Sequence, residues 1–130
     1  MKTKPIKIEK DFNRPWGGFI KFIDNKPCTV KILFLKKGEI LSFQSHQWRQ
    51  EYWYLISGKI RVFKGPIRKT WKSIKRNLKI FILKPGETIS IPKNTVHSME
   101  GLSNSKILEI SIGKFKETDE IRYQDKYGRK

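Results

Sequence analysis

The chain has 130 residues and a mass of 15.4 kDa, which is the size of one compact domain. Its content of 37% hydrophobic and 12% aromatic residues is typical of a globular protein and excludes a disordered chain. No apolar run approaches the roughly 18 residues that a membrane span needs, and the N-terminal residues lack the apolar stretch of a signal peptide. The lone cysteine, Cys28, excludes an internal disulfide framework. We therefore expect a cytoplasmic protein that forms a single domain over residues 1–130.

The formal net charge of +17 raises the question of a nucleic-acid partner. The chain contains 22 lysines, 7 arginines and 18 isoleucines but no alanine. Because lysine and isoleucine have A/T-rich codons, a codon bias accounts for much of this composition. A surface for phosphate groups or base edges would use arginine more heavily. We therefore expect neither nucleic acid nor a membrane as partner, although the charge would suit a small phosphorylated substrate.

Taken in chain order, the segments read as β-strands divided by turns, with almost no helical periodicity. The first is a run of branched and apolar residues that ends before the turn at Gly38. A later strand contains the aromatic sequence Tyr-Trp-Tyr-Leu-Ile, and Gly58 follows it. The strands are expected over residues 28–35, 39–44, 51–57, 59–63, 78–83, 88–91 and 106–112. Many short strands with glycine or proline between them predict an all-β sandwich or small barrel.

Two segments depart from this pattern. Residues 64–77 form a basic connection that includes Trp71 and Ile74. A short helix, a long hairpin or a solvated loop would each suit this composition. Residues 116–130 mix acidic and basic residues with tyrosine, so we expect them to pack across the barrel or against a partner chain.

The two histidines, His46 and His97, each lie beside a turn between predicted strands. Gln44 and His46 are two residues apart, so on a strand their side chains point to the same face. Glu51 begins the next strand and can return to that face across a hairpin. Together these side chains supply an amide oxygen, two imidazoles and a carboxylate, a set suited to a divalent ion such as Zn, Mn, Fe or Co. The alternative is a hydrogen-bonded polar cluster that binds no metal.

The residues around the two histidines form two spaced blocks that resemble the two cupin motifs, with Gln44 where the commonest pattern has its first histidine. Arg-Pro-Trp-Gly at residues 14–17 and Asp-x-Tyr-Gly-Arg at residues 125–129 bracket these blocks. With them, the chain resembles the cupin domain of type II mannose-6-phosphate isomerases, which also forms the C-terminal part of bifunctional enzymes that make GDP-mannose. The resemblance covers residues 12–129. Further matching residues are Lys31, Arg49, Tyr52, Trp53, Ile91, Pro92, Glu109, Gly113, Asp119 and Arg122.

The resemblance implies a cupin fold, which is a double-stranded β-helix or jelly-roll barrel. It also implies a metal-dependent aldose–ketose isomerase that interconverts mannose 6-phosphate and fructose 6-phosphate and so feeds GDP-mannose and polysaccharide synthesis. The cofactor would be one divalent metal ion, with Zn, Mn, Co, Fe and Mg all open. By this likeness the metal ligands would be Gln44, His46, Glu51 and His97.

Isomerisation moves a proton between C1 and C2 of the sugar through an enediol(ate), so a general base must reach the C–H bond. Glu109, whose strand neighbours are apolar, is the first candidate for a buried carboxylate with a raised pKa. A pair with a barrel lysine or arginine is the other interpretation of this residue. Lys31 and Arg14 complete the expected catalytic set. The expected phosphate contacts, which could instead form structural salt bridges, are Arg49, Arg122 and Arg129.

Partners can also be expected from the sequence. Small cupins commonly pair through strand exchange or sheet edges, so we expect a homodimer. The chain has no glycine-rich phosphate loop, so we do not expect it to transfer a guanylyl group itself. A separate guanylyltransferase would supply that step. The alternative function is a non-catalytic or differently specific cupin that binds a sugar phosphate or a nucleotide sugar.

Overall fold

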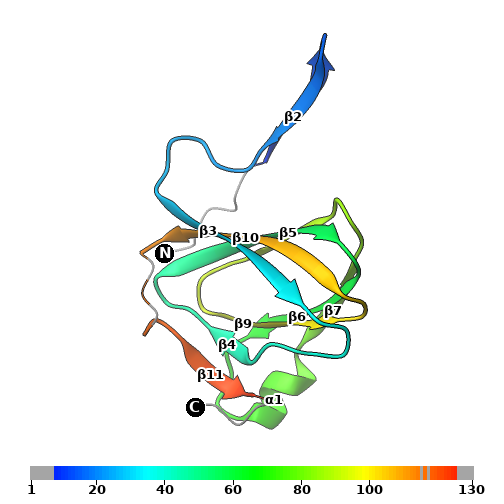
Figure 1. Ribbon diagram of the computed structural model, residues 1–130. Helices are drawn as coiled ribbons and strands as arrows, with labels where there is room; N and C mark the ends of the chain where they lie inside the picture. The colour runs from blue at the N-terminus through cyan, green and yellow to red at the C-terminus, as the bar shows by residue number, and fades with distance from the viewer. Residues whose placement is uncertain (1–7, 115, 117, 126–130) are drawn as a thin grey trace.

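The computed structural model of the chain describes residues 8–114, 116 and 118–125. Two antiparallel β-sheets face each other and enclose the core (Figure 1). The strand order of the first sheet is β3 (Cys28–Leu35), β10 (Ser105–Gly113), β5 (Arg49–Ser57) and β8 (Thr88–Ile91). The second sheet contains β11 (Ile121–Gln124), β4 (Phe43–Ser45), β9 (Thr95–Gly101), β6 (Ile60–Pro66) and β7 (Lys79–Leu83). Outside both sheets lie a hairpin of β1 (Glu9–Arg14) and β2 (Gly17–Lys21) and the helix α1 (Trp71–Arg76). The expected all-β architecture is confirmed.

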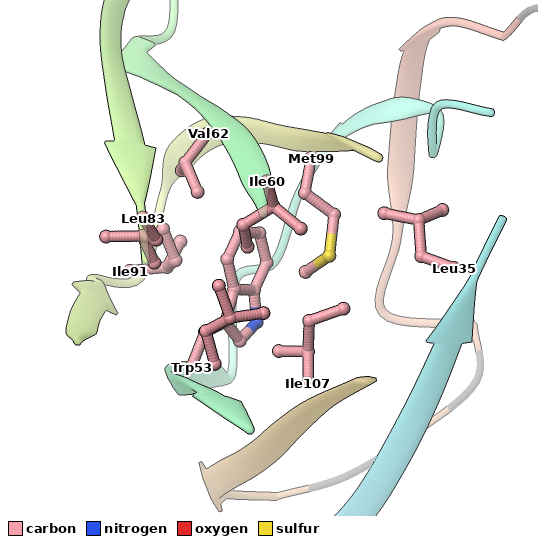
Figure 2. Packing of buried hydrophobic residues seen from close by; sticks show 9 residues of the cluster. Leu35, Trp53, Ile60, Val62, Leu83, Ile91, Met99 and Ile107 are labelled. Carbon is pink, nitrogen blue, oxygen red and sulfur yellow. The ribbon is translucent and has the colours of Figure 1, made fainter. Parts of the chain in front are cut away.

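The space between the sheets has an apolar part and a polar part. On β5, Trp53 and Leu55 point into the core, while Glu51 lies two residues earlier on the same face. The register continues this division across the sheet, because Leu55 pairs with Ile107 whereas Glu51 pairs with Ser111. Figure 2 shows the apolar part, whose buried members are Leu35, Trp53, Leu55, Ile60, Val62, Leu83, Ile91, Met99 and Ile107. Apolar side chains therefore fill one part of the space between the sheets, and the buried polar side chains lie together in the other part.

Most expected strands are present with nearly the expected bounds, but the strand over residues 39–44 is wrong over most of its length. Only β4 remains of it, and Ile40 forms a single bridge with Glu100. The chain approaches β9 here through isolated backbone bonds, such as the one that Leu41 N donates to Met99 O at 3.0 Å. This part of the chain is therefore a loop with local sheet contacts rather than a continuous strand.

Two strands of the second sheet were not predicted. β9 contains polar residues where a strand with an apolar face would be expected. Its His97 and Ser98 are nevertheless buried, because β9 lies between β4 and β6. β11 belongs to the charged C-terminal segment and pairs with β4, where the Tyr123 hydroxyl lies 2.8 Å from Ser45 Oγ. The described part of that segment thus packs across the barrel, as one of the two alternatives expected.

The basic connection between β6 and β7 contains the short helix α1, which was one of its three interpretations. Thr70 is the N-cap, and its side chain accepts a hydrogen bond from Ser73 N at 3.1 Å. Ile74 anchors the helix because its side chain is only 2% exposed. Over the residues that the structure describes, no helix has the length and apolar character that crossing a membrane requires.

Candidate metal centre and active site

A cavity of about 460 Å³ opens at the polar end of the barrel, between the two sheets. Strands of both sheets contribute to it, with alternate residues of β5 and β9, every residue of β3 from Lys31 to Leu35, and Glu109 of β10. Its lining consists of Lys31, Ile32, Leu33, Phe34, Leu35, Leu41, Gln44, His46, Arg49, Glu51, Trp53, His97, Met99, Glu109 and Glu120. All four predicted metal ligands are therefore brought together, with two of the three predicted catalytic residues.

Three of the predicted ligands form a compact buried cluster. One donor atom each from His46, Glu51 and His97 lies within 4.8 Å of the others. Glu51 stands between the imidazoles, with Oε2 3.6 Å from His46 Nε2 and Oε1 3.4 Å from His97 Nε2. The side chains of all three are only 3% exposed. Two imidazoles and a carboxylate that converge in this way form a donor set that divalent metals such as Zn and Mn accept.

Main-chain carbonyls fix the orientation of both rings. His46 Nδ1 lies 2.7 Å from Asp119 O, and His97 Nδ1 lies 2.8 Å from Thr95 O. Because a carbonyl can only accept, each Nδ1 carries a proton, and each Nε2 faces the cluster. Metal-binding histidines are commonly oriented in this way by an acceptor on the other nitrogen.

Gln44 lines the same cavity and carries a further oxygen donor. It pairs in register with His97 across β4 and β9. Its Oε1 is buried and has no hydrogen-bond partner among the described residues. A buried polar atom without a partner is costly, and coordination of a cation would satisfy this oxygen. The donor set and the orphaned oxygen both fit a divalent ion.

The protonation states of the cluster also suit a cation. Burial by itself raises the pKa of Glu51, but the adjacent His97 ring, together with His46 and Arg49, outweighs burial and lowers that pKa to about 2. Burial lowers the pKa of His46, against the opposing effect of Glu51. At neutral pH the cluster therefore holds an ionised carboxylate and a neutral His46 imidazole, which are the forms that bind metals.

Glu109 lies beside the cluster on the central strand of a three-strand ladder. It pairs in register with Lys31 on β3 and with Trp53 on β5, and it is 8% exposed. Burial is the main cause that raises the pKa of Glu109, to about 7, and the charge of Glu51 adds to it. Lys31 opposes the rise. The raised pKa agrees with the first interpretation of Glu109, whereas its register neighbour Lys31 is a barrel lysine of the kind that the alternative interpretation required.

The predicted arginines lie in different places. Arg49 lines the cavity, where Nη2 donates to His46 Nε2 at 3.3 Å and Nη1 donates to Lys116 O at 3.2 Å. Arg122 does not line it, and its Nε contacts Glu120 Oε2 at 2.6 Å. Arg14 lies on the hairpin outside both sheets, where it pairs with Asp11 at 3.0 Å. Arg129 lies outside the described residues.

Sequence reasoning missed the residues that hold the ligands in place. Asp119 lies 73 residues from His46, and besides its carbonyl it uses its carboxylate, which accepts from Gln47 N at 2.8 Å and Trp48 N at 2.9 Å. Thr95 acts only through its backbone. A main-chain acceptor has no residue-type signal, so the sequence offered no means of finding Thr95. Asp119 was a matching residue of the family pattern, but nothing local indicated its contact with the turn after His46.

Comparison with known families decides the relationship of the chain. Residues 2–126 match the family described as mannose-6-phosphate isomerase C-terminal. The chain belongs to this family. Mannose-1-phosphate guanylyltransferase RfbM of Salmonella typhimurium is 30% identical to it over 94% of the chain, and a mannose-1-phosphate guanylyltransferase of Escherichia coli is 29% identical over 95%. Both alignments cover 24% of the relative, so the chain spans about a quarter of the length of these curated relatives.

Solved structures confirm the fold that the family implies. The RmlC epimerase of Mycobacterium tuberculosis superposes with a TM-score of 0.67 at 14% identity, over 90% of this chain and 66% of the epimerase. A dTDP sugar isomerase of Desulfovibrio desulfuricans gives a TM-score of 0.65 at 10% identity, over 93% of this chain and 83% of that one. The chain is thus a cupin barrel of the mannose-6-phosphate isomerase family.

Proposed function

We propose that the chain is a metal-dependent aldose–ketose isomerase that interconverts mannose 6-phosphate and fructose 6-phosphate. The observation that carries this proposal is the buried cluster of His46, Glu51 and His97 beside Glu109 in one cavity. Three donor atoms converge there next to a carboxyl group whose pKa lies near neutrality. Proton transfer at a carbon next to a carbonyl needs a base and a group that stabilises the charge developing on the oxygen, and a divalent cation can be that group.

Gln44, His46, Glu51 and His97 are the residues that would hold the metal. When bound, a divalent ion supplies Lewis acidity that polarises a carbonyl oxygen and stabilises the negative charge that develops on it. The protein orients the two imidazoles through Asp119 O and Thr95 O. Trp53, whose ring centre lies 5.6 Å from that of His97, packs against the cluster from the apolar side and excludes water there.

Glu109 is the residue that we assign to proton transfer. As a carboxylate it takes the proton from C2 of mannose 6-phosphate, and the electron pair of the broken C–H bond forms a C1–C2 double bond. The acid form of Glu109 then returns the proton to C1, while the hydroxyl proton of O2 is transferred to O1. A pKa of about 7 leaves both forms of Glu109 populated at neutral pH. The product has the same atoms as the substrate, with the carbonyl moved to C2.

The positive groups of the cavity lie close to Glu109. Lys31 is its register partner and lines the cavity, so its charge favours the carboxylate form of the base. Arg49 is the other cation of the described lining. Its contact with His46 Nε2 places the guanidinium beside the ligand cluster, where it would bind the phosphate of the substrate.

Turnover of mannose 6-phosphate by metal-loaded protein tests the proposal. We expect activity that is lost on chelation and that falls at least 100-fold in Glu51→Gln and in Glu109→Gln. The two variants differ in one respect, because only Glu51→Gln should also lose metal. The matched control is Glu100→Gln, which changes a partly exposed carboxylate that is paired with Arg61 and does not line the cavity.

Three outcomes separate the candidate functions. Metal-dependent turnover that Glu100→Gln retains would support the isomerase. Saturable sugar-phosphate binding with stoichiometric metal but without turnover would overturn it in favour of a binding cupin. Turnover that persists in Glu109→Gln would be compatible with the isomerase function but would overturn the assignment of Glu109 as the base.

A further inference from the structure

Two lysines lie opposite each other on neighbouring strands of the second sheet. Lys64 on β6 and Lys79 on β7 are register partners, so their side chains project from the same face of the sheet (Figure 1). Like charges directly opposite each other destabilise an antiparallel pair of strands. Within the described part of the chain, neither lysine forms an ion pair that would offset this repulsion.

The side chain of Lys64 is held between the two sheets. It lies on the same face of β6 as the core residue Val62, and it is partly buried. Its Nζ donates a hydrogen bond to Ser90 O of β8, in the opposite sheet, at 3.1 Å, and lies 5.5 Å from the ring centre of Phe81. Ser90 O is its one acceptor among the described residues, so two of the three N–H donors of the ammonium remain for a ligand.

Both lysines line a cavity of about 380 Å³ that we call the Lys64–Lys79 cavity. The other residues of its described lining carry no charge and are Gly65, Pro66, Asn77, Pro92, Asn94 and Thr95. No residue lines both this cavity and the one that contains the metal cluster. Ammonium, amide N–H and hydroxyl groups all donate hydrogen bonds. The cavity therefore presents donors and positive charge, with no carboxylate in its described lining, to a ligand that enters it.

We propose that the Lys64–Lys79 cavity binds a phosphate group, either as the free anion or at one end of a small metabolite. A dianion between the two ammonium groups would accept hydrogen bonds from both and replace their repulsion by attraction. A small ligand is favoured over nucleic acid because Lys64 is partly buried and bonded to the opposite sheet, and because a duplex is too wide to enter a cavity of this volume.

The Lys64–Lys79 cavity adjoins the backbone that orients the candidate metal ligands. Thr95, whose carbonyl accepts from His97 Nδ1, lines this cavity, as does Asn94, whose N donates to His46 O at 2.8 Å. An anion that contacts both residues would hold the connection between β8 and β9 that fixes the two histidines. We therefore expect the anion to strengthen metal binding, and the metal to strengthen anion binding by the same factor. This consequence rests on the proposed function, whereas the anion site does not.

Titration of the metal-free protein with inorganic phosphate tests the site. The backbone N–H resonances of Gly65 and Asn77 report on it, because both residues line this cavity and neither lines the catalytic one. We expect saturable shifts and an affinity that falls at least about 10-fold in Lys64→Gln and in Lys79→Gln, since each loses one charge-assisted hydrogen bond. Sodium chloride at equal ionic strength is the reference. The matched control is Lys84→Gln, because Lys84 is exposed directly after β7 and does not line the cavity.

Thermal unfolding of the same variants provides a second measurement. Without phosphate, Lys79→Gln should be at least as stable as the wild type, because the substitution removes the repulsion from Lys64. Phosphate should raise the melting temperature of the wild type and of Lys84→Gln, because it binds the folded state. It should raise that of Lys79→Gln much less. A loss of phosphate binding in a variant that is as stable as the wild type cannot result from misfolding.

The outcomes of the titration decide the anion site. Shifts that Lys84→Gln retains and that both cavity variants lose support it, and mannose 6-phosphate in place of phosphate then shows whether a sugar phosphate or the free anion binds more tightly. Shifts that chloride reproduces, or that are equal in all variants, overturn it. Loss of binding only in Arg49→Gln would also overturn it, because Arg49 lines the catalytic cavity. Displacement of phosphate by a short DNA duplex would overturn the choice of a small ligand.

Zinc binding in the presence of sulfate tests the link to the metal cluster. Sulfate is a tetrahedral dianion like phosphate but does not precipitate zinc. We expect the dissociation constant for zinc, measured by competition with a chromogenic chelator, to fall about 5-fold in saturating sulfate and to stay unchanged in Lys64→Gln. An equal constant with and without sulfate in the wild type would overturn the link, while the phosphate titration would still decide the site. An inactive wild-type protein would count against the proposed function and would leave the anion site standing.

Discussion

The orientation of His46 depends on a residue far away in the chain. Asp119 accepts from the imidazole through its main-chain oxygen and from two successive backbone N–H groups, those of Gln47 and Trp48, through its carboxylate. The carboxylate therefore holds the turn after His46, and the carbonyl holds the ring. Such contacts outside the ligand set decide how well a metal site is pre-organised, because they fix the lone pair before the ion arrives.

Asp119→Ala should therefore weaken metal binding although no ligand is removed. We expect the dissociation constant for Zn or Co to rise about 10- to 100-fold, the usual effect of losing an orienting contact. Competition with a chromogenic chelator measures it. Asp24→Ala is the control, because Asp24 is exposed and its contacts lie with Asn25 and Lys21. Unchanged affinity in Asp119→Ala would show that the carbonyl alone orients the ring.

The buried carboxyl of Glu109 should make stability depend on pH. Its pKa is about 7 in the folded protein against about 4.5 for an ordinary glutamate, so the folded state binds more protons between these pH values. The resulting stabilisation is complete below about pH 4.5 and is lost as pH rises through 7. In chelator-treated protein, Glu109→Gln should therefore gain stability over the wild type on going from pH 5 to pH 8, by on the order of 2 kcal/mol.

Urea unfolding at several pH values measures this difference. The variant must be compared with the wild type at each pH, because His46 also contributes to the pH dependence. Its lowered pKa makes its contribution to the free energy of unfolding rise with pH in both proteins. A difference in unfolding free energy that stays constant from pH 5 to pH 8 would contradict a raised pKa for Glu109.

At the scale of elements, the strands with regular patterns could be predicted from the sequence and those with polar interiors could not. The branched run of β3 and the aromatic run of β5 indicate strands directly. β9 could not be predicted because its buried residues are polar. His97 lies in the candidate site and Ser98 donates to Leu41 O at 2.6 Å, so the burial of both residues depends on partners elsewhere in the fold. The gathering of the four candidate ligands in one cavity could be predicted because their spacing is local to two blocks. The position of Arg14 could not be predicted, since it depends on where the whole hairpin of β1 and β2 lies.

The turn at Gly58 has no space for a side chain. Its φ is +93°, and a Cβ there would lie 2.6 Å from Asn104 O, a backbone atom that cannot move aside. Gly86 has a similar φ of +91° with nothing within 4 Å of a Cβ. Gly86→Ala should cost about 1 kcal/mol of unfolding free energy from backbone strain alone. Gly58→Ala should cost at least about 2 kcal/mol more, because overpacking adds to the strain.

Urea denaturation of the two alanine variants separates strain from overpacking. The pair is matched in residue type and φ, so their difference reports only the space around the Cβ. Equal losses of stability would mean that the loop at Asn104 shifts freely, and the tight junction between β5 and β6 would then not be needed for the fold.

For the whole molecule, the positive charge is unevenly spread along the chain. Residues 52–86 contain ten lysines and arginines and no acidic residue, and they include β6, α1 and β7. β6 and β7 lie side by side in the second sheet. This basic region gives the molecule a general attraction for polyanions.

This attraction should be non-specific and sensitive to salt. If about four cations contact DNA phosphates, the affinity for a short duplex should fall on the order of 100-fold between 50 and 200 mM salt. Fluorescence anisotropy with two unrelated duplexes measures it, and both sequences should bind alike. The affinity for mannose 6-phosphate should fall far less over the same range, because its cavity is buried and buried charges are screened less than exposed ones. A duplex whose binding resists salt or depends on sequence would assign the basic region a specific nucleic-acid partner, and the lysine-rich composition would then reflect selection for that partner rather than codon bias.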